Sequence, residues 1–95
     1  MALDASAATA KVQVIHIKIV NFMFSPMKVK VNPGELIEVT NEDTVAHTLT
    51  AVHRQFNTGN IGHLQTKSFH APKKPGTYNY ICNIHQFMTG SIVVK

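Results

Sequence analysis

The chain has 95 residues, of which 44% are hydrophobic and 15% charged, so it has the composition of one small globular domain rather than a disordered segment. Its formal net charge is +4, but the lysines are scattered and no aromatic residues alternate with them, which argues against nucleic-acid binding. No apolar run reaches the roughly 18 residues of a membrane span.

The N-terminal residues 1–10 are rich in Ala and Ser and have neither a basic region nor a long apolar stretch, so they do not form a signal peptide. We expect a flexible segment over 1–10 and a single domain over 11–95. The segment is typical of the start of a mature exported chain. We therefore expect a periplasmic or otherwise extracytoplasmic protein, with the signal peptide absent from this chain.

The first half of the chain predicts three strands. β-Branched residues dominate Val12–Val20, and a change in the phase of the alternation near Ile15 predicts a bulge. The next strand has an inward-facing set at alternate positions: Met27, Val29 and Val31. The turn Asn32-Pro33-Gly34-Glu35 separates it from a third strand, Leu36–Thr40, which ends at Asn41–Thr44.

The second half predicts four more strands: His47–Val52, Leu64–His70, Thr77–Cys82 and Ser91–Val94. The stretch between His53 and His63 contains Gly and Asn and is expected to be irregular. Pro72 and Pro75-Gly76 frame a turn. Seven or eight short strands without helical periodicity predict an all-β fold, an antiparallel β-sandwich.

Cys82, His85 and Met88 stand three residues apart, just before the last predicted strand, and Cys82 is the only cysteine. Thiolate, imidazole and thioether are ligands that a soft, redox-active copper ion prefers, and one more histidine completes a blue-copper set. A lone cysteine and a lone methionine more often serve packing alone. Packing does not explain their joint spacing, however. Tyr78, Tyr80 and Cys82 share one face of a strand, so Cys82 points inward if the tyrosines do.

Five other histidines compete for the fourth ligand position: His16, His47, His53, His63 and His70. His47 follows a turn and opens an apolar run, so we expect it at a strand end, where it can reach a site at the mouth of the sandwich. His16 lies in mid-strand and His70 just before a proline, as ordinary surface or packed histidines do. His53 and His63 flank one loop and are candidates for contact with a second ion.

The segment Pro75–Val94 resembles the C-terminal signature of the cupredoxins, the blue copper proteins, and its ligand spacings are similar to those of amicyanin. Looser similarity upstream covers Phe22–Met27, Val31–Gly34 and Asn41–Asp43 followed by His47-Thr48. The resemblance runs from Val12 to Lys95 and implies a Greek-key β-sandwich. It also implies one type 1 copper held by His47, Cys82 and His85 with Met88 axial, and a tyrosine-corner role for Tyr78.

Two positions depart from the amicyanin pattern, because Ile84 and Gln86 replace the prolines that flank the ligand histidine. Ile84 restores an N–H that can reach the Cys82 sulfur, and Thr48 offers a second one. Hydrogen bonds to the thiolate favour Cu(I), so we expect a raised reduction potential. Gln86 places a polar group in a collar that is commonly apolar.

These features predict a small, soluble, monomeric carrier that shuttles one electron through a Cu(II)/Cu(I) site to redox partner proteins, with His85 as the exposed exit. Its positive charge suits docking to an acidic or membrane-bound partner. The resemblance also implies that His85 can protonate and leave reduced copper at acid pH. A copper chaperone or storage protein with the same ligands is the alternative. An enzyme is not expected, since no paired carboxylates or open metal position are apparent.

Overall fold

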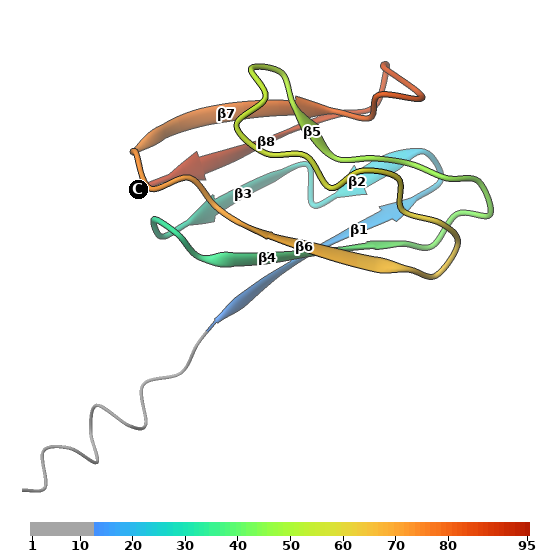
Figure 1. Ribbon diagram of the computed structural model, residues 1–95, viewed down its shortest axis with the longest axis horizontal. Coiled ribbons are helices and arrows are strands. Elements are labelled where there is room, and N and C mark those ends of the chain that lie inside the picture. Colours follow the sequence, from blue (N-terminus) through green and yellow to red (C-terminus); the bar gives the residue numbers. More distant parts are fainter. Residues whose placement is uncertain (1–12) are drawn as a thin grey trace, which may run out of the picture.

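Alternating apolar residues build two sheets that stack face to face in the computed structural model, which describes residues 13–95 (Figure 1). The predicted flexible segment 1–10 lies outside the described residues, and the domain boundary at residue 11 stays a prediction. The strands are β1 (Val14–Val20), β2 (Met23–Ser25), β3 (Lys28–Val31), β4 (Leu36–Asn41), β5 (Thr50–Ala51), β6 (Thr66–His70), β7 (Gly76–Ile81) and β8 (Thr89–Val94). Residues 13–95 contain no helix that is long and apolar enough to cross a membrane.

One sheet has the strand order β2-β1-β4-β6 and the other β3-β8-β7-β5. The predicted all-β sandwich of seven or eight strands is therefore confirmed. Its pairing is mixed rather than wholly antiparallel, because β1 runs parallel to β4 and β3 runs parallel to β8. Between β1 and β4 the chain crosses to the other sheet, where it forms β3. It returns by a crossover rather than a hairpin, and a crossover gives parallel neighbours.

The core lies between the sheets and is filled by the inward residues of each strand, with Ile17, Ile37, Tyr80 and Ile92 among the most deeply buried. The predicted bulge near Ile15 is absent, since β1 pairs with β4 in unbroken register from Val14 to Ile19. The outer face of β1 carries two half-buried valines, Val14 and Val20, beside two exposed polar residues.

Met27 does not belong to the inward set, because β3 begins only at Lys28 and the Met27 side chain is 55% exposed. The three-residue strand β2 was not predicted. The predicted strand His47–Val52 is reduced to the two residues of β5. The irregular stretch that follows turns back and lies antiparallel to residues 47–50. His47 forms an isolated bridge with Ile61. His47 N–H donates to Ile61 O at 3.1 Å, and Ile61 N–H donates to His47 O at 2.7 Å.

Candidate metal centre

Asn41, at the end of β4, fixes the loop that presents His47. Its side chain is fully buried. Asn41 Nδ2 donates to the carbonyl oxygens of Val45 and Ile61, both at 2.8 Å. Its Oδ1 accepts from the backbone N–H of Asp43 at 2.9 Å. Both amide hydrogens and the amide oxygen are thus used on the backbone around His47, and this shapes the loop without a regular strand.

The segment from Cys82 to Met88 forms a closed hoop between β7 and β8. Cys82 N–H donates to Met88 O at 3.2 Å, and Met88 N–H donates to His85 O at 3.0 Å. The antiparallel pairing of β7 with β8 continues up to the pair Ile81 and Thr89, directly below the hoop. The hydrogen-bonded hairpin therefore supports the segment that carries three of the predicted ligands.

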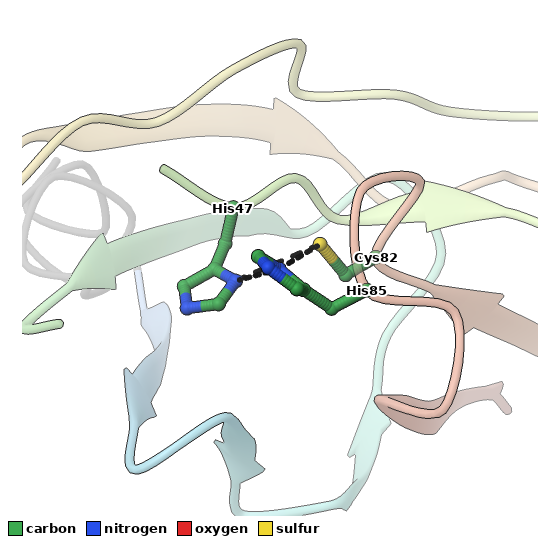
Figure 2. Close-up of side chains that lie close together, drawn as sticks. All are labelled: His47, Cys82 and His85. Carbon is green, nitrogen blue, oxygen red and sulfur yellow. Dashed lines mark hydrogen bonds between the residues drawn. The ribbon is translucent and has the colours of Figure 1, made fainter. Parts of the chain in front are cut away.

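These two loops bring His47, Cys82 and His85 together at one end of the sandwich (Figure 2). Cys82 Sγ lies 3.7 Å from His47 Nδ1 and 4.0 Å from His85 Nδ1, and the two Nδ1 atoms are 3.2 Å apart. Three donors about 2.1 Å from a common ion in a trigonal plane would lie about 3.6 Å from one another. The observed distances bracket that value, so these side chains fit around a single ion.

The donor set identifies the metal that fits best. His47 and Cys82 are fully buried, Met88 is 2% exposed, and His85 is half-buried. Two imidazoles and a thiolate beside a thioether are the ligands of a blue-copper site, whereas calcium and magnesium require oxygen ligands. The predicted inward direction of Cys82 and Tyr80 is also observed.

The Cys82 sulfur receives a hydrogen bond from Thr48 N–H at 3.3 Å, as expected. The hydroxyl of Thr48 accepts the N–H of Asn83 at 2.9 Å, which ties the two ligand loops together. The other expected donor, Ile84 N–H, makes no hydrogen bond to the sulfur within residues 13–95. Any effect of such bonds on the reduction potential therefore depends on Thr48.

Asp43 contacts the site although no sequence motif marked it. His47 Nε2 lies 2.9 Å from Asp43 Oδ2. Because a carboxylate oxygen only accepts hydrogen bonds, this contact favours the tautomer with its proton on Nε2 and with Nδ1 directed at the cluster. The same carboxylate accepts the N–H groups of Asn21 and Phe22 at 2.8 and 2.9 Å. Burial alone would raise the pKa of the Asp43 carboxyl, but hydrogen bonds from Phe22, His47 and Asn21 outweigh it and hold that pKa below its usual value.

Apolar side chains surround the half-buried His85. The ring of Phe22 lies edge-on to the rings of both His47 and His85, with centroid distances of 5.0 and 4.9 Å. Phe87 stacks on Phe22 and is 72% exposed, and Ile84 is 47% exposed. Gln86, also exposed, introduces the polar group that was expected in this collar.

The remaining histidines do not join the site. His16 lies 3.5 Å from Glu38 on the outer face of the first sheet, and His70 Nδ1 lies 3.1 Å from Gly34 O. Both are exposed surface residues, as predicted. His53 and His63 are exposed too, and His63 Nδ1 lies 2.9 Å from the backbone oxygen of Asp43. Within residues 13–95, only His47, Cys82 and His85 form a metal-binding cluster of three, so the candidate second site at His53 and His63 finds no support.

The tyrosine corner is present, since the Tyr78 hydroxyl donates to Lys74 O, four residues upstream, at 2.6 Å. Tyr80, two residues further along β7, is fully buried beneath the site. Gly90 lies opposite Tyr80 in β8 and makes room for it, because a Cβ at Gly90 would be 2.5 Å from the phenol ring.

Comparison with known proteins gives a consistent result. The family model for the cupredoxin-like domain matches residues 1–94. Amicyanin-alpha of Methylorubrum extorquens is 31% identical over 87 residues, which are 84% of this chain and 71% of that protein. The copper-containing nitrite reductase of Thermus scotoductus SA-01 has a TM-score of 0.80 at 27% identity, over 90% of this chain but only 23% of the reductase. The Cu(I) form of an amicyanin variant has the same fold, with a TM-score of 0.78 at 23% identity over 94% of this chain and 89% of that one. The chain therefore belongs to the cupredoxin-like family, whose members bind copper, and its own donor set fits that metal.

Proposed function

We propose that this protein is a small electron carrier that holds one copper ion through His47, Cys82 and His85, with Met88 as a weak axial ligand. The observation that supports this best is the cluster of one sulfur and two nitrogen donors, 3.2 to 4.0 Å apart, at the end of a rigid sandwich. When bound, the copper supplies a one-electron Cu(II)/Cu(I) couple.

The residues of the site are held so that they need not move when the charge of the ion changes. Asp43 fixes the ring of His47, and Thr48 N–H donates to the sulfur of Cys82. One backbone hydrogen bond, from Cys82 N–H to Met88 O, joins the two ends of the hoop that carries His85, and a second runs from Met88 N–H to His85 O. A site that needs little rearrangement between redox states exchanges electrons quickly, because preorganised ligands cost little reorganisation energy.

His85 is the proposed point of electron exit, because it is the most exposed of the three clustered ligands. The exposed apolar residues around it, Ile84 and Phe87 foremost, suit a transient contact with a redox partner protein. The net charge of +4 would steer the carrier toward an acidic or membrane-bound partner. We propose that the carrier works as a monomer in the periplasm or another extracytoplasmic space.

A chaperone or storage role would use the same ligands but requires that copper be released readily. The full burial of His47 and Cys82 favours retention of the ion over exchange. We also propose that the domain has no catalytic activity of its own. The similar nitrite reductase is an enzyme, but this chain covers only 23% of its length.

Voltammetry of the copper-loaded protein, combined with competition by a Cu(I) chelator, tests the proposal. An electron carrier gives a reversible one-electron wave, and the chelator removes copper far more slowly than electrons are exchanged. Replacing Cys82 by Ser serves as the control and is expected to abolish the wave. Rapid copper loss to the chelator without a reversible wave would instead indicate a chaperone or storage protein.

A further inference from the structure

The turn between β1 and β2 has an unusual backbone for its sequence. Its two central residues, Asn21 and Phe22, have φ angles of 52° and 59°. A two-residue hairpin turn of the favoured kind needs positive φ at both positions, which suits Asn followed by Gly. A bulky residue such as Phe is strained in this region. Glycine would be the relaxed choice at position 22, so the phenylalanine needs another explanation.

Core packing does not supply that explanation, because the Phe22 side chain is 37% exposed. Its ring instead lies across the two ligand imidazoles, which belong to different loops. The interplanar angles are 86° with His47 and 84° with His85, so the ring stands almost perpendicular to both. Edge-to-face contacts of this kind are favourable and restrict the rotation of both partners.

A single carboxylate holds this turn against the site. Asp43 Oδ1 accepts the N–H of Asn21, and Asp43 Oδ2 accepts the N–H of Phe22. The same Oδ2 lies 2.9 Å from His47 Nε2. The turn and the first ligand histidine therefore share one anchor. Figure 1 shows the β1–β2 turn at the same end of the sandwich as the hoop between β7 and β8.

We propose that Phe22 is a positioning residue for both ligand histidines, that Asp43 keeps it in place, and that this turn sets the redox preference of the copper although it supplies no ligand. The inference rests on the proposed function. The ring fills the space beside both imidazoles and keeps water from that side. Without it, water would stabilise the more highly charged Cu(II) state relative to Cu(I).

The decisive variant is Phe22→Gly, because it removes the ring and at the same time relieves the backbone strain, so the fold should survive. We expect the ratio of Cu(I) to Cu(II) affinity to fall about tenfold, which lowers a one-electron potential by about 59 mV. Phe22→Tyr keeps the ring and should keep the potential. Met23→Ala is the matched control, because Met23 is an apolar neighbour in the same hairpin and is 54% exposed.

A second readout needs no copper. Nuclear magnetic resonance of the metal-free protein should show ordered rings for His47 and His85 in the wild type and faster ring motion in Phe22→Gly. A double-mutant cycle with Asp43→Ala tests the anchor: the effect of Phe22→Gly on ring motion should largely vanish in that background. Additive effects would overturn the role of Asp43.

The role of Phe22 is overturned if Phe22→Gly leaves both the potential and the ring motion unchanged, or if Met23→Ala shifts the potential equally. Failure of the proposed function would look different. The wild type would then show no reversible copper couple, while the ring motion of the metal-free protein would still report on positioning.

Discussion

The phenol of Tyr80 offers a sharp test of the packing beneath the site. Its side chain is fully buried, and within residues 13–95 its hydroxyl has no hydrogen-bond partner. An unpaired buried hydroxyl costs about 1–3 kcal/mol. Tyr80→Phe removes the hydroxyl and keeps the ring that packs edge-on against Phe24, so we expect the free energy of unfolding to rise by about 1–3 kcal/mol. In a domain of this size, each kcal/mol raises Tm by about 4–8 °C.

The same residue predicts a dependence on pH. Burial raises the pKa of the Tyr80 phenol well above its ordinary value. The folded protein therefore keeps the phenol proton at pH values where the tyrosine of the unfolded chain, with a pKa of about 10, has released it. The stability that the folded protein gains by keeping this proton is complete below about pH 10. Above that pH the free energy of unfolding falls by up to about 1.4 kcal/mol per pH unit. Tyr80→Phe lacks this alkaline loss.

Urea unfolding of the metal-free protein, at neutral pH and again above about pH 10, measures both effects. Tyr78→Phe is the matched control on the same face of the same strand. It deletes the hydrogen bond to Lys74 O and should lower stability by about 0.5–1.5 kcal/mol. A Tyr80→Phe protein less stable than the wild type would refute the reasoning, since it would mean that the hydroxyl has a partner.

Three further predictions concern the supports of the site. Asn41→Ala leaves Val45 O, Ile61 O and Asp43 N–H without their partner. It should lower the free energy of unfolding in urea by at least about 1–3 kcal/mol. Unchanged stability would mean that these groups find other partners. Gly90→Ala puts a Cβ against the Tyr80 ring and should lower the free energy of unfolding by about 1–3 kcal/mol. The loss should be smaller in a Tyr80→Ala background. An equal loss in both backgrounds would contradict the contact. Copper removal should lower Tm in calorimetry, because a ligand at a hundred times its Kd stabilises the folded protein by about 2.7 kcal/mol. Cys82→Ser should abolish the difference in Tm between the copper-loaded and the metal-free protein.

The local part of the site could be predicted because three of its candidate ligands lie within seven consecutive residues. Cys82, His85 and Met88 lie on one hoop, so their spacing alone indicates a shared metal. The sequence predicts His47 at the end of a strand. The structure instead presents it from an irregular loop shaped by Asn41, yet its position at the mouth of the sandwich is the same.

The non-local part could not be predicted from one sequence. Asp43 and Phe22 are 21 residues apart, and their contact appears only when β1 and β4 pair side by side. Nothing in the local sequence marks a phenylalanine with positive φ, since the turn signals rest on Gly and Asn. The parallel pairing of β1 with β4 and of β3 with β8 is likewise a property of the crossovers, not of strand composition.

The central claim is that Cys82, together with His47 and His85, binds one copper ion as a thiolate. Visible and electron paramagnetic resonance spectra of the protein loaded with Cu(II), beside those of Cys82→Ser, test it most directly. We predict an intense blue band with a narrow copper hyperfine splitting in the wild type and neither feature in the variant. A pale, ordinary Cu(II) spectrum in the wild type would contradict thiolate ligation and with it the proposed electron-transfer function.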